Sequence, residues 1–172
     1  MLSSDDVFHG RVQVRPKRCG SSSFFGIIET GSGMSEVKVE VELENTVDRG
    51  LVQRGLLNQD QVRSFKARVL TNTGAVMLVL PQDYVEALGL PEIRKIVVTY
   101  AEERKEERPV AGPVTVRVDN RGATVDCIVG PPNSEPLLGH VVLEIMDLLV
   151  DATQQRLVPR PESPFLPELK VK

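Results

Sequence analysis

The sequence predicts a mostly β domain, closer to a closed barrel than to an open parallel sheet. Short apolar runs recur along the 172 residues, and several of them alternate with polar residues, as half-buried strands do. Only two segments carry a helical pattern, and both are short. We expect an aliphatic core, because the chain has no Trp and aromatic residues make up only 4% of it.

Composition and charge exclude several classes of protein. Hydrophobic residues make up 41% and charged residues 26%, as in ordinary globular proteins. A net charge of −3 gives no general attraction to nucleic acid or anionic membranes, and no apolar run approaches the roughly 18 residues of a membrane span. The only cysteines and histidines are Cys19, Cys127, His9 and His140, which predict neither a disulfide framework nor a metal site. We expect a reduced, cytoplasmic protein with no cofactor, no metal, no nucleic-acid partner and no membrane partner.

Residues 1–35 differ from the rest of the chain. They contain flexible Gly/Ser stretches and no sustained period, so we expect a disordered or mis-annotated leader. Met34 is a candidate translation start, because the ordered pattern begins just after it. We expect the folded domain at residues 36–160. Residues 161–172 are expected to be an extended tail, because prolines recur in them.

The first half of the domain shows three strand signals. Val and Leu alternate with charged residues over 37–44, which predicts a half-buried strand. Residues 45–64 are polar, contain two glycines and predict an excursion with at most a helical turn near 59–63. Alternation returns at 65–70, and the apolar run 75–81 predicts a buried strand.

A two-turn helix is predicted over residues 81–91. Tyr84, Val85 and Leu88 share one face of this helix, and Gly89 is placed to end it.

The second half of the domain predicts further strands and one more helix. Two β-rich runs flank the charged segment 102–108, which indicates a hairpin with a solvated tip. A strand, an apolar triplet interrupted by a glycine, a short helix and a final hairpin follow. These features cover residues 96–101, 110–118, 123–132, 136–151, 148–150 and 156–158.

One stretch interrupts the pattern. Residues 69–75 read VLTNTGA, so an apolar strand runs directly into Asn72, Thr73 and Gly74. A buried strand rarely ends in an amide, a hydroxyl and a glycine unless these groups have a task. A second short motif, LLG at 137–139, precedes the last predicted helix.

These two motifs resemble those of the retropepsin-like aspartic protease family, the single-lobed retroviral-type proteases and their bacterial relatives. In that family the active-site loop reads apolar-apolar-Asp-Thr/Ser-Gly-Ala, and an apolar-apolar-Gly triplet followed by a short helix comes near the C-terminus. The order of the intervening elements also fits, with the predicted hairpin where the family's flap lies. The resemblance covers about residues 36–160.

The resemblance implies a closed β-barrel with one or two short helices and an aspartic endopeptidase that acts as a homodimer on a peptide or protein substrate. Each chain would supply half of the active site. The catalytic positions would be Asn72, Thr73 and Gly74, and the substrate-binding positions would be Ala75, Leu138 and Gly139.

The family's chemistry needs two carboxylates. They hold a water molecule and share one proton, because two like charges so close together cannot both ionise. One carboxylate accepts the proton of the water while the other polarises the scissile carbonyl. The threonine hydroxyl can bond across to the partner loop, and the glycine permits close backbone approach.

Asn72 departs from this pattern, because it stands where the family has the catalytic Asp. A carboxamide can donate and accept hydrogen bonds, so the loop can survive the change. It has no useful proton affinity, however, and a homodimer would carry Asn on both sides. We therefore expect the protease fold with weak or no peptidase activity.

Three interpretations of Asn72 are open. It can be a natural loss that leaves a peptide-binding or dimerisation module, or an engineered inactivating change. Alternatively, activity is retained through deamidation of Asn72 or through pairing with an active paralogue. An Asn-Thr-Gly tight turn between two strands is a further explanation of the stretch, and without the LLG motif it would be the preferred one. The near-match at residues 29–32, ETGS, lies in the leader and has no apolar strand after it.

A few other residues carry weaker signals. The resemblance implies a basic residue after the second motif that ties the last helix to the region of the active-site loop. His140 would take this role when protonated, and a half-exposed histidine at a helix start is the alternative. Asp126 and Asp151 lie near strand ends and are expected to be solvated or to cap turns, with an additional acid near the site as the alternative. Cys127 is expected to be a small buried hydrophobic residue.

Overall fold

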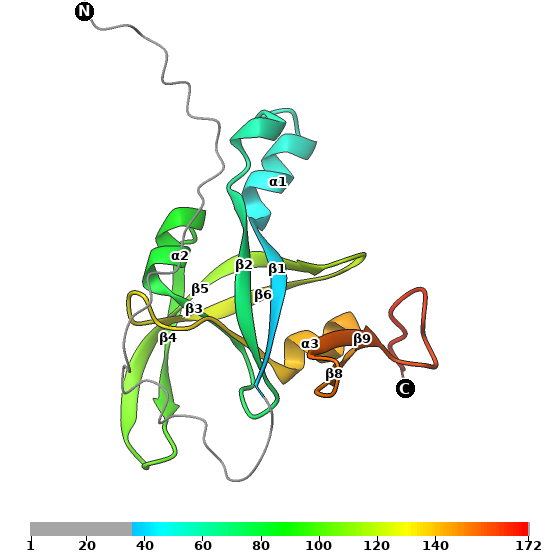
Figure 1. The fold of residues 1–172 in the computed structure, drawn as a ribbon. Helices are drawn as coiled ribbons and strands as arrows, with labels where there is room; N and C mark the ends of the chain where they lie inside the picture. The colour runs from blue at the N-terminus through cyan, green and yellow to red at the C-terminus, as the bar shows by residue number, and fades with distance from the viewer. Residues whose placement is uncertain (1–35, 172) are drawn as a thin grey trace, which may run out of the picture.

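The computed structural model describes residues 36–171 (Figure 1). The expectations for the leader, for a start at Met34 and for the ETGS near-match at residues 29–32 lie outside the described residues. None of the helices in the described part of the chain is long and apolar enough to cross a membrane.

The described chain forms a closed β-barrel, which confirms the predicted fold class. Its large sheet has the strand order β1-β2-β7-β3-β6-β5-β4, and β1 also pairs with β5, so six strands close into a ring. The seventh strand, β4, pairs with the outer part of β5. The bounds are β1 Val37–Asn45, β2 Ser64–Asn72, β3 Leu78–Pro81, β4 Glu92–Thr99, β5 Lys105–Val118, β6 Arg121–Gly130 and β7 Leu137–Gly139.

The barrel closes because β5 is long enough to have two neighbours on one edge. Residues 105–111 of β5 pair with β4, and residues 114–117 pair with β1. The β4–β5 hairpin therefore extends beyond the barrel as an arm, as Figure 1 shows. The predicted hairpin is present, but its reversal occupies residues 100–104. The charged residues 105–108 belong to β5 rather than to the tip.

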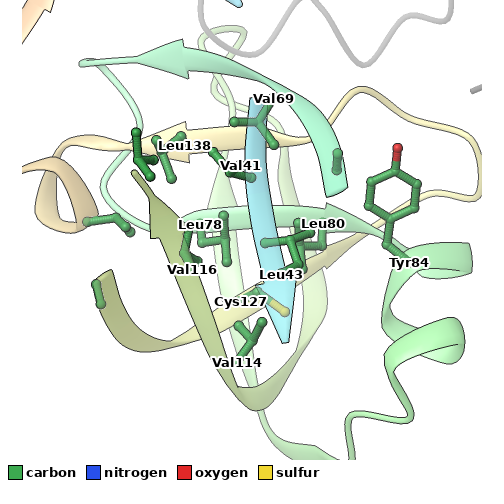
Figure 2. Packing of buried hydrophobic residues seen from close by; sticks show 14 of the residues in the cluster. Val41, Leu43, Val69, Leu78, Leu80, Tyr84, Val114, Val116, Cys127 and Leu138 are labelled. Atoms are coloured by element: carbon green, nitrogen blue, oxygen red, sulfur yellow. The ribbon is translucent and has the colours of Figure 1, made fainter. Parts of the chain in front are cut away.

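The core is aliphatic, as the composition predicts. Inward-facing residues of β1 alternate with exposed ones, and they meet the buried faces of the other strands inside the barrel. Figure 2 shows this packing around Leu43, Leu78 and Leu80. In the core, Phe65 and Tyr84 form an aromatic contact, with ring centroids 5.1 Å apart in an edge-to-face arrangement.

Three short α-helices accompany the barrel in residues 36–171, where the sequence predicts one or two. The predicted helix is α2 (Gln82–Leu88); its residues Tyr84, Val85 and Leu88 are buried, and Gly89 ends it at φ 62° in the left-handed region. The helix before the final hairpin is α3 (His140–Met146). The final hairpin is formed by β8 (Leu148–Asp151) and β9 (Arg156–Pro159).

The additional helix, α1 (Thr46–Gln53), lies in the segment read from sequence as a polar excursion. The Asn45 side chain caps it by accepting the N–H of Asp48 at 3.1 Å, and the same side chain donates to the carbonyl of Leu88 at 2.8 Å. The 3₁₀ turn at Gln59–Gln61 matches the helical turn predicted near residues 59–63. The sequence pattern does not predict α1, because polar contacts rather than an apolar stripe hold this helix to the barrel.

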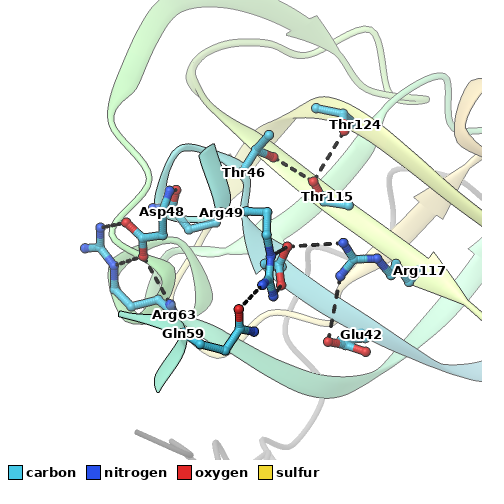
Figure 3. A network of polar contacts seen from close by, with 11 residues as sticks. Glu42, Thr46, Asp48, Arg49, Gln59, Arg63, Thr115, Arg117 and Thr124 are labelled. Carbon is cyan, nitrogen blue, oxygen red and sulfur yellow. Dashed lines mark hydrogen bonds and ion pairs between the residues drawn. The ribbon is translucent and has the colours of Figure 1, made fainter. Parts of the chain in front are cut away.

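A buried carboxylate fastens α1 to the barrel wall, and Figure 3 labels the two arginines that bind it, Arg49 and Arg117. Glu44 is 0% exposed, and its oxygens accept hydrogen bonds from Arg49 Nε at 3.0 Å and Arg117 Nη2 at 3.2 Å. The bonds from Arg49 lower the pKa of Glu44 below its ordinary value, although burial opposes the shift. The nearby Glu42 is partly exposed and lies 3.9 Å from Arg117.

We expect Glu44→Gln to lower the free energy of unfolding at pH 7 by about 1.5–3 kcal/mol, because it removes a charge-assisted acceptor from two guanidinium groups. Glu42→Gln is the matched control and should change stability by less than about 0.5 kcal/mol. Urea denaturation measures both variants.

The difference between wild type and Glu44→Gln should depend on pH. Because the pKa of Glu44 is lowered in the folded state, its contribution is complete above the ordinary glutamate pKa of about 4.3 and is lost as the pH falls through the folded value. A difference that stayed constant down to strongly acidic pH would contradict this assignment.

Candidate functional site

The two sequence motifs lie side by side. Strand β2 pairs in parallel with β7, which places Asn72 opposite Gly139 and Leu70 opposite Leu137. On its other side β7 pairs with β3, the strand that leaves the loop after Asn72. The chain between β2 and β3 therefore crosses over the end of β7. Segments that are far apart in the sequence thus form one local structure.

The side chain of Asn72 shapes the loop. Its Oδ1 accepts the N–H of Gly74 at 2.8 Å and the N–H of Ala75 at 3.2 Å, and its backbone carbonyl also accepts from Ala75 at 3.2 Å. This is a turn in which the side-chain oxygen takes the place of a backbone carbonyl. A carboxylate oxygen could accept the same two bonds, so the turn is compatible with Asn or Asp at position 72.

Position 139 requires glycine because the backbone of the loop passes very close to it. A Cβ atom at this position would lie 2.7 Å from the carbonyl carbon and oxygen of Val76 and would also collide with the carbonyl oxygen of Met77. Atoms at such distances must move, and here they are backbone atoms that cannot rotate away. The glycine therefore allows the loop of the first motif to lie directly on the second motif.

Helix α3 holds the loop from the same side. The N–H groups of His140 and Val141 donate to the carbonyls of Ala75 and Val76 at 2.8 and 3.3 Å. The ring nitrogen Nδ1 of His140 lies 3.0 Å from the carbonyl oxygen of Ala75, so this nitrogen carries the proton of the contact. The predicted tie between His140 and the loop is therefore present, and the helix start uses two of its otherwise unpaired N–H groups.

The predicted site residues differ in accessibility. Thr73 and Gly74 are exposed at the tip of the loop, and Asn72, beside them, is half-buried. Leu138, predicted to contact substrate, is 0% exposed and belongs to the core cluster. Its side chain packs inside the barrel and supports the site from behind. Gly139 is buried under the loop, and Ala75 is half-buried.

Specific side-chain contacts hold the reversal of the β4–β5 hairpin, although its charged sequence indicates a solvated turn. Tyr100 is only 5% exposed, and its hydroxyl donates to Glu106 at 2.8 Å. This bond is the largest cause that lowers the pKa of Glu106. Arg104 lies over the Tyr100 ring, 4.5 Å from its centroid. The signal in the sequence is an aromatic residue followed closely by charges of both signs, a pattern that also suits a solvated turn.

The remaining candidate residues are Asp151, Asp126 and Cys127, and each has a structural role. Asp151 Oδ1 accepts the N–H groups of Thr153 and Gln154, both at 3.0 Å, so the turn-capping interpretation is confirmed. Asp126 forms an ion pair with Arg94 at 3.1 Å on the surface of the arm. Cys127 is fully buried, and burial raises the pKa of its thiol to about 12. Within residues 36–171, no group of three or more His, Cys, Asp or Glu side chains could hold a metal ion.

The fold of this chain is similar to that of a solved protease structure. The crystal structure of a retropepsin-like aspartic protease from Rickettsia conorii overlaps 70% of this chain and 91% of its own chain, with a TM-score of 0.36 and 19% sequence identity. No protein-family model matches the sequence. No curated protein matches it either.

We expect Gly139→Ala to destabilise the protein by about 1–3 kcal/mol, because the added methyl group forces the loop away from β7. Gly50→Ala, in α1, is the control. A Cβ there meets nothing within 4 Å, so this variant should be neutral or stabilising by up to about 1 kcal/mol. Urea denaturation gives both values. Equal effects of the two substitutions would mean that the close approach at Gly139 is not a constraint.

Proposed function

We propose that this chain is a retropepsin-type domain that binds extended peptides at a homodimer interface, and that Asn72, in the position of the catalytic Asp, leaves it without efficient peptidase activity. One observation carries the proposal. The loop with Asn72, Thr73 and Gly74 is built directly against the Leu-Leu-Gly motif, in parallel register, with Gly139 allowing the contact.

The accessibility of the loop supports the homodimer. A single loop of this kind supplies only half of a two-carboxyl site, so two loops must meet. Thr73 and Gly74 are exposed at the tip, and Val76, which follows shortly after them, is 58% exposed. An apolar group of this size beside an exposed turn is suited to burial in a symmetric contact with a second copy.

The proposed loss of catalysis follows from the chemistry of the amide. General acid–base catalysis is typically worth about 10²–10⁴-fold, and in an aspartic peptidase both steps depend on it. The carboxamide of Asn72 retains the hydrogen bonds that shape the loop and lacks the proton acceptor. Binding of an extended peptide does not need that acceptor. The arm formed by β4 and β5 reaches beyond the barrel and offers a strand along which a peptide could pair.

We expect Asn72→Asp to create peptidase activity that the wild type lacks. Both proteins should be incubated with a casein-like substrate at acidic pH, with and without a pepstatin-type inhibitor, and cleavage products counted by mass spectrometry. Cleavage by the Asn72→Asp variant alone, sensitive to the inhibitor, is the expected result. Thr71→Ser, prepared in the same way, is the control and should not create activity.

Other outcomes lead to other conclusions. Inhibitor-sensitive cleavage by wild type would show that the amide does not limit the site. If neither protein cleaves substrate and neither binds the inhibitor in a calorimetric titration, the proposed function is wrong and a purely structural dimer is favoured.

We also expect Asn72→Asp to lower the melting temperature of the dimer at neutral pH. Two carboxyl groups brought together cannot both ionise without repulsion, so the pKa of one is raised in the folded dimer. The cost is therefore small at acidic pH, where the pair holds a proton, and grows as the pH rises. Asn58→Asp adds the same charge at the start of an exposed 3₁₀ turn and should have little effect. A higher melting temperature for the Asn72→Asp dimer than for wild type at pH 7 would contradict the paired-loop arrangement.

A further inference from the structure

The tail that follows β9 is fastened to the barrel at a buried carboxylate. Asp147, which ends α3, is 3% exposed. Its Oδ2 accepts the hydroxyl of Ser163 and, at 3.1 Å, the N–H of Glu168, while its Oδ1 forms an ion pair with Arg160 at 2.8 Å. We call residues 160–168 the strap. The strap contains no helix or strand, and contacts with one side chain hold both of its ends.

A buried arginine binds the same carboxylate, the end of α3 and the strap. Arg121, the first residue of β6, is 2% exposed, and its Nη1 lies 3.5 Å from Oδ2 of Asp147. Nη1 also donates to the carbonyls of Met146 and Asp147 at 3.0 and 2.8 Å. Nη2 donates to the carbonyl of Ser163, while the buried Nε meets no acceptor in residues 36–171. The buried charge of Arg121 therefore depends on these few partners, and the strap supplies one of them.

The other end of α3 lies on the candidate site. The N–H groups of His140 and Val141 donate to the carbonyls of Ala75 and Val76, and the His140 ring bonds to Ala75 as well. A helix of seven residues is too short to be stable by itself, because isolated helices need about 12–15 residues. The position of α3, and of the loop that it holds, therefore depends on the contacts at both ends of the helix.

We propose that the strap positions the Asn72 loop through Arg121, Asp147 and α3, so that release of the strap loosens this loop. Ser163 is 6% exposed, and it gives its hydroxyl to Asp147 and its carbonyl to Arg121. When the strap leaves, water reaches both charged groups and competes with the last carbonyls of α3 for Arg121. The helix then loses its fixed end, and the loop loses its support.

The contacts favour an effect on α3 over an effect confined to the final hairpin. Strands β8 and β9 pair with each other along their whole length, from Leu148 opposite Pro159 to Asp151 opposite Arg156. This pairing does not use the strap, so the hairpin keeps it when the strap leaves. The last turn of α3 has no such ladder and relies on Arg121.

The strap is thus a means of regulating the candidate site from a distance. Figure 1 shows α3, β8, β9 and the end of the chain grouped at one end of the barrel. Whatever holds or releases the strap changes the loop with Asn72. As regulation of a peptide site this inference rests on the proposed function. The coupling itself can be measured in the chain without peptide and without a second copy.

The test measures the tautomer of His140 by nitrogen NMR of the full chain at about pH 8, where free imidazole side chains are uncharged. Nδ1 carries the proton while it bonds to Ala75, because the hydrogen bond of a neutral histidine sets its tautomer. When the loop loosens, the proton is free to move to Nε2. We expect Arg160→Ala/Ser163→Ala to lower the ratio of the Nδ1–H to the Nε2–H tautomer at least about threefold.

Two further variants grade this effect. Arg160→Ala alone removes one ion pair from a side chain that is 44% exposed, so it should lower the ratio by a smaller factor. Arg160→Lys/Ser163→Thr keeps the charge and the hydroxyl and should restore most of the wild-type ratio.

Two controls separate positioning from general destabilisation. Arg156→Ala/Thr153→Ala removes the same kinds of side chain from the final hairpin, where Arg156 lies 3.9 Å from Asp151, and should leave the ratio unchanged. Glu44→Gln weakens the barrel at α1 and leaves the strap in place, so it should not change the ratio either.

The outcomes distinguish this inference from the proposed function. A ratio that is the same in wild type and Arg160→Ala/Ser163→Ala overturns the coupling, as does an equal fall in either control or a wild type without the Nδ1–H tautomer. Each of these results leaves the proposed function intact, because its peptidase and inhibitor assays do not involve the strap. Failure of those assays, with the ratio lowered as expected, overturns the peptide site and leaves the coupling in place.

Discussion

The close approach of Gly139 to the backbone at Val76 and Met77 is the constraint on which the candidate site depends. No side chain fits between these two segments, so the loop can lie on β7 only if position 139 is glycine. Once this contact is made, β7 fits between β2 and β3, and the barrel has the strand it needs for closure. The site and the fold therefore share one steric requirement, and a change there would affect both.

Asn72 separates two properties that a catalytic aspartate combines. The side-chain oxygen of Asn72 organises the turn by accepting two backbone N–H groups, and an amide oxygen does this as well as a carboxylate oxygen. The other half of the side chain would carry the chemistry, and an NH₂ group cannot accept a proton from water. The geometry of the turn is therefore independent of whether position 72 carries an amide or a carboxylate.

Helix α3 is held at both of its ends by contacts with other segments of the chain. Its first N–H groups donate to the loop carbonyls, and its last carbonyl accepts from Arg121. A helix of seven residues leaves most of its backbone groups without partners of its own, so both ends need outside contacts. These contacts fix the position of the helix between the Asn72 loop and the anchor of the tail.

The sequence by itself determined the elements whose signals are local. Alternating residues in β1 and β2, the apolar face of α2 with its terminal Gly89, and the order of the two motifs are properties of neighbouring residues, and the barrel follows from many such strands. Only the tertiary structure decided that Leu138 packs inward, that α1 forms on a polar segment, and that Tyr100 closes the arm. It also decided that Arg121 meets Asp147. The partners in these contacts come from distant segments or are polar, and polar residues have no periodic pattern that reveals burial. Their environment exists only when the closed barrel brings the segments together.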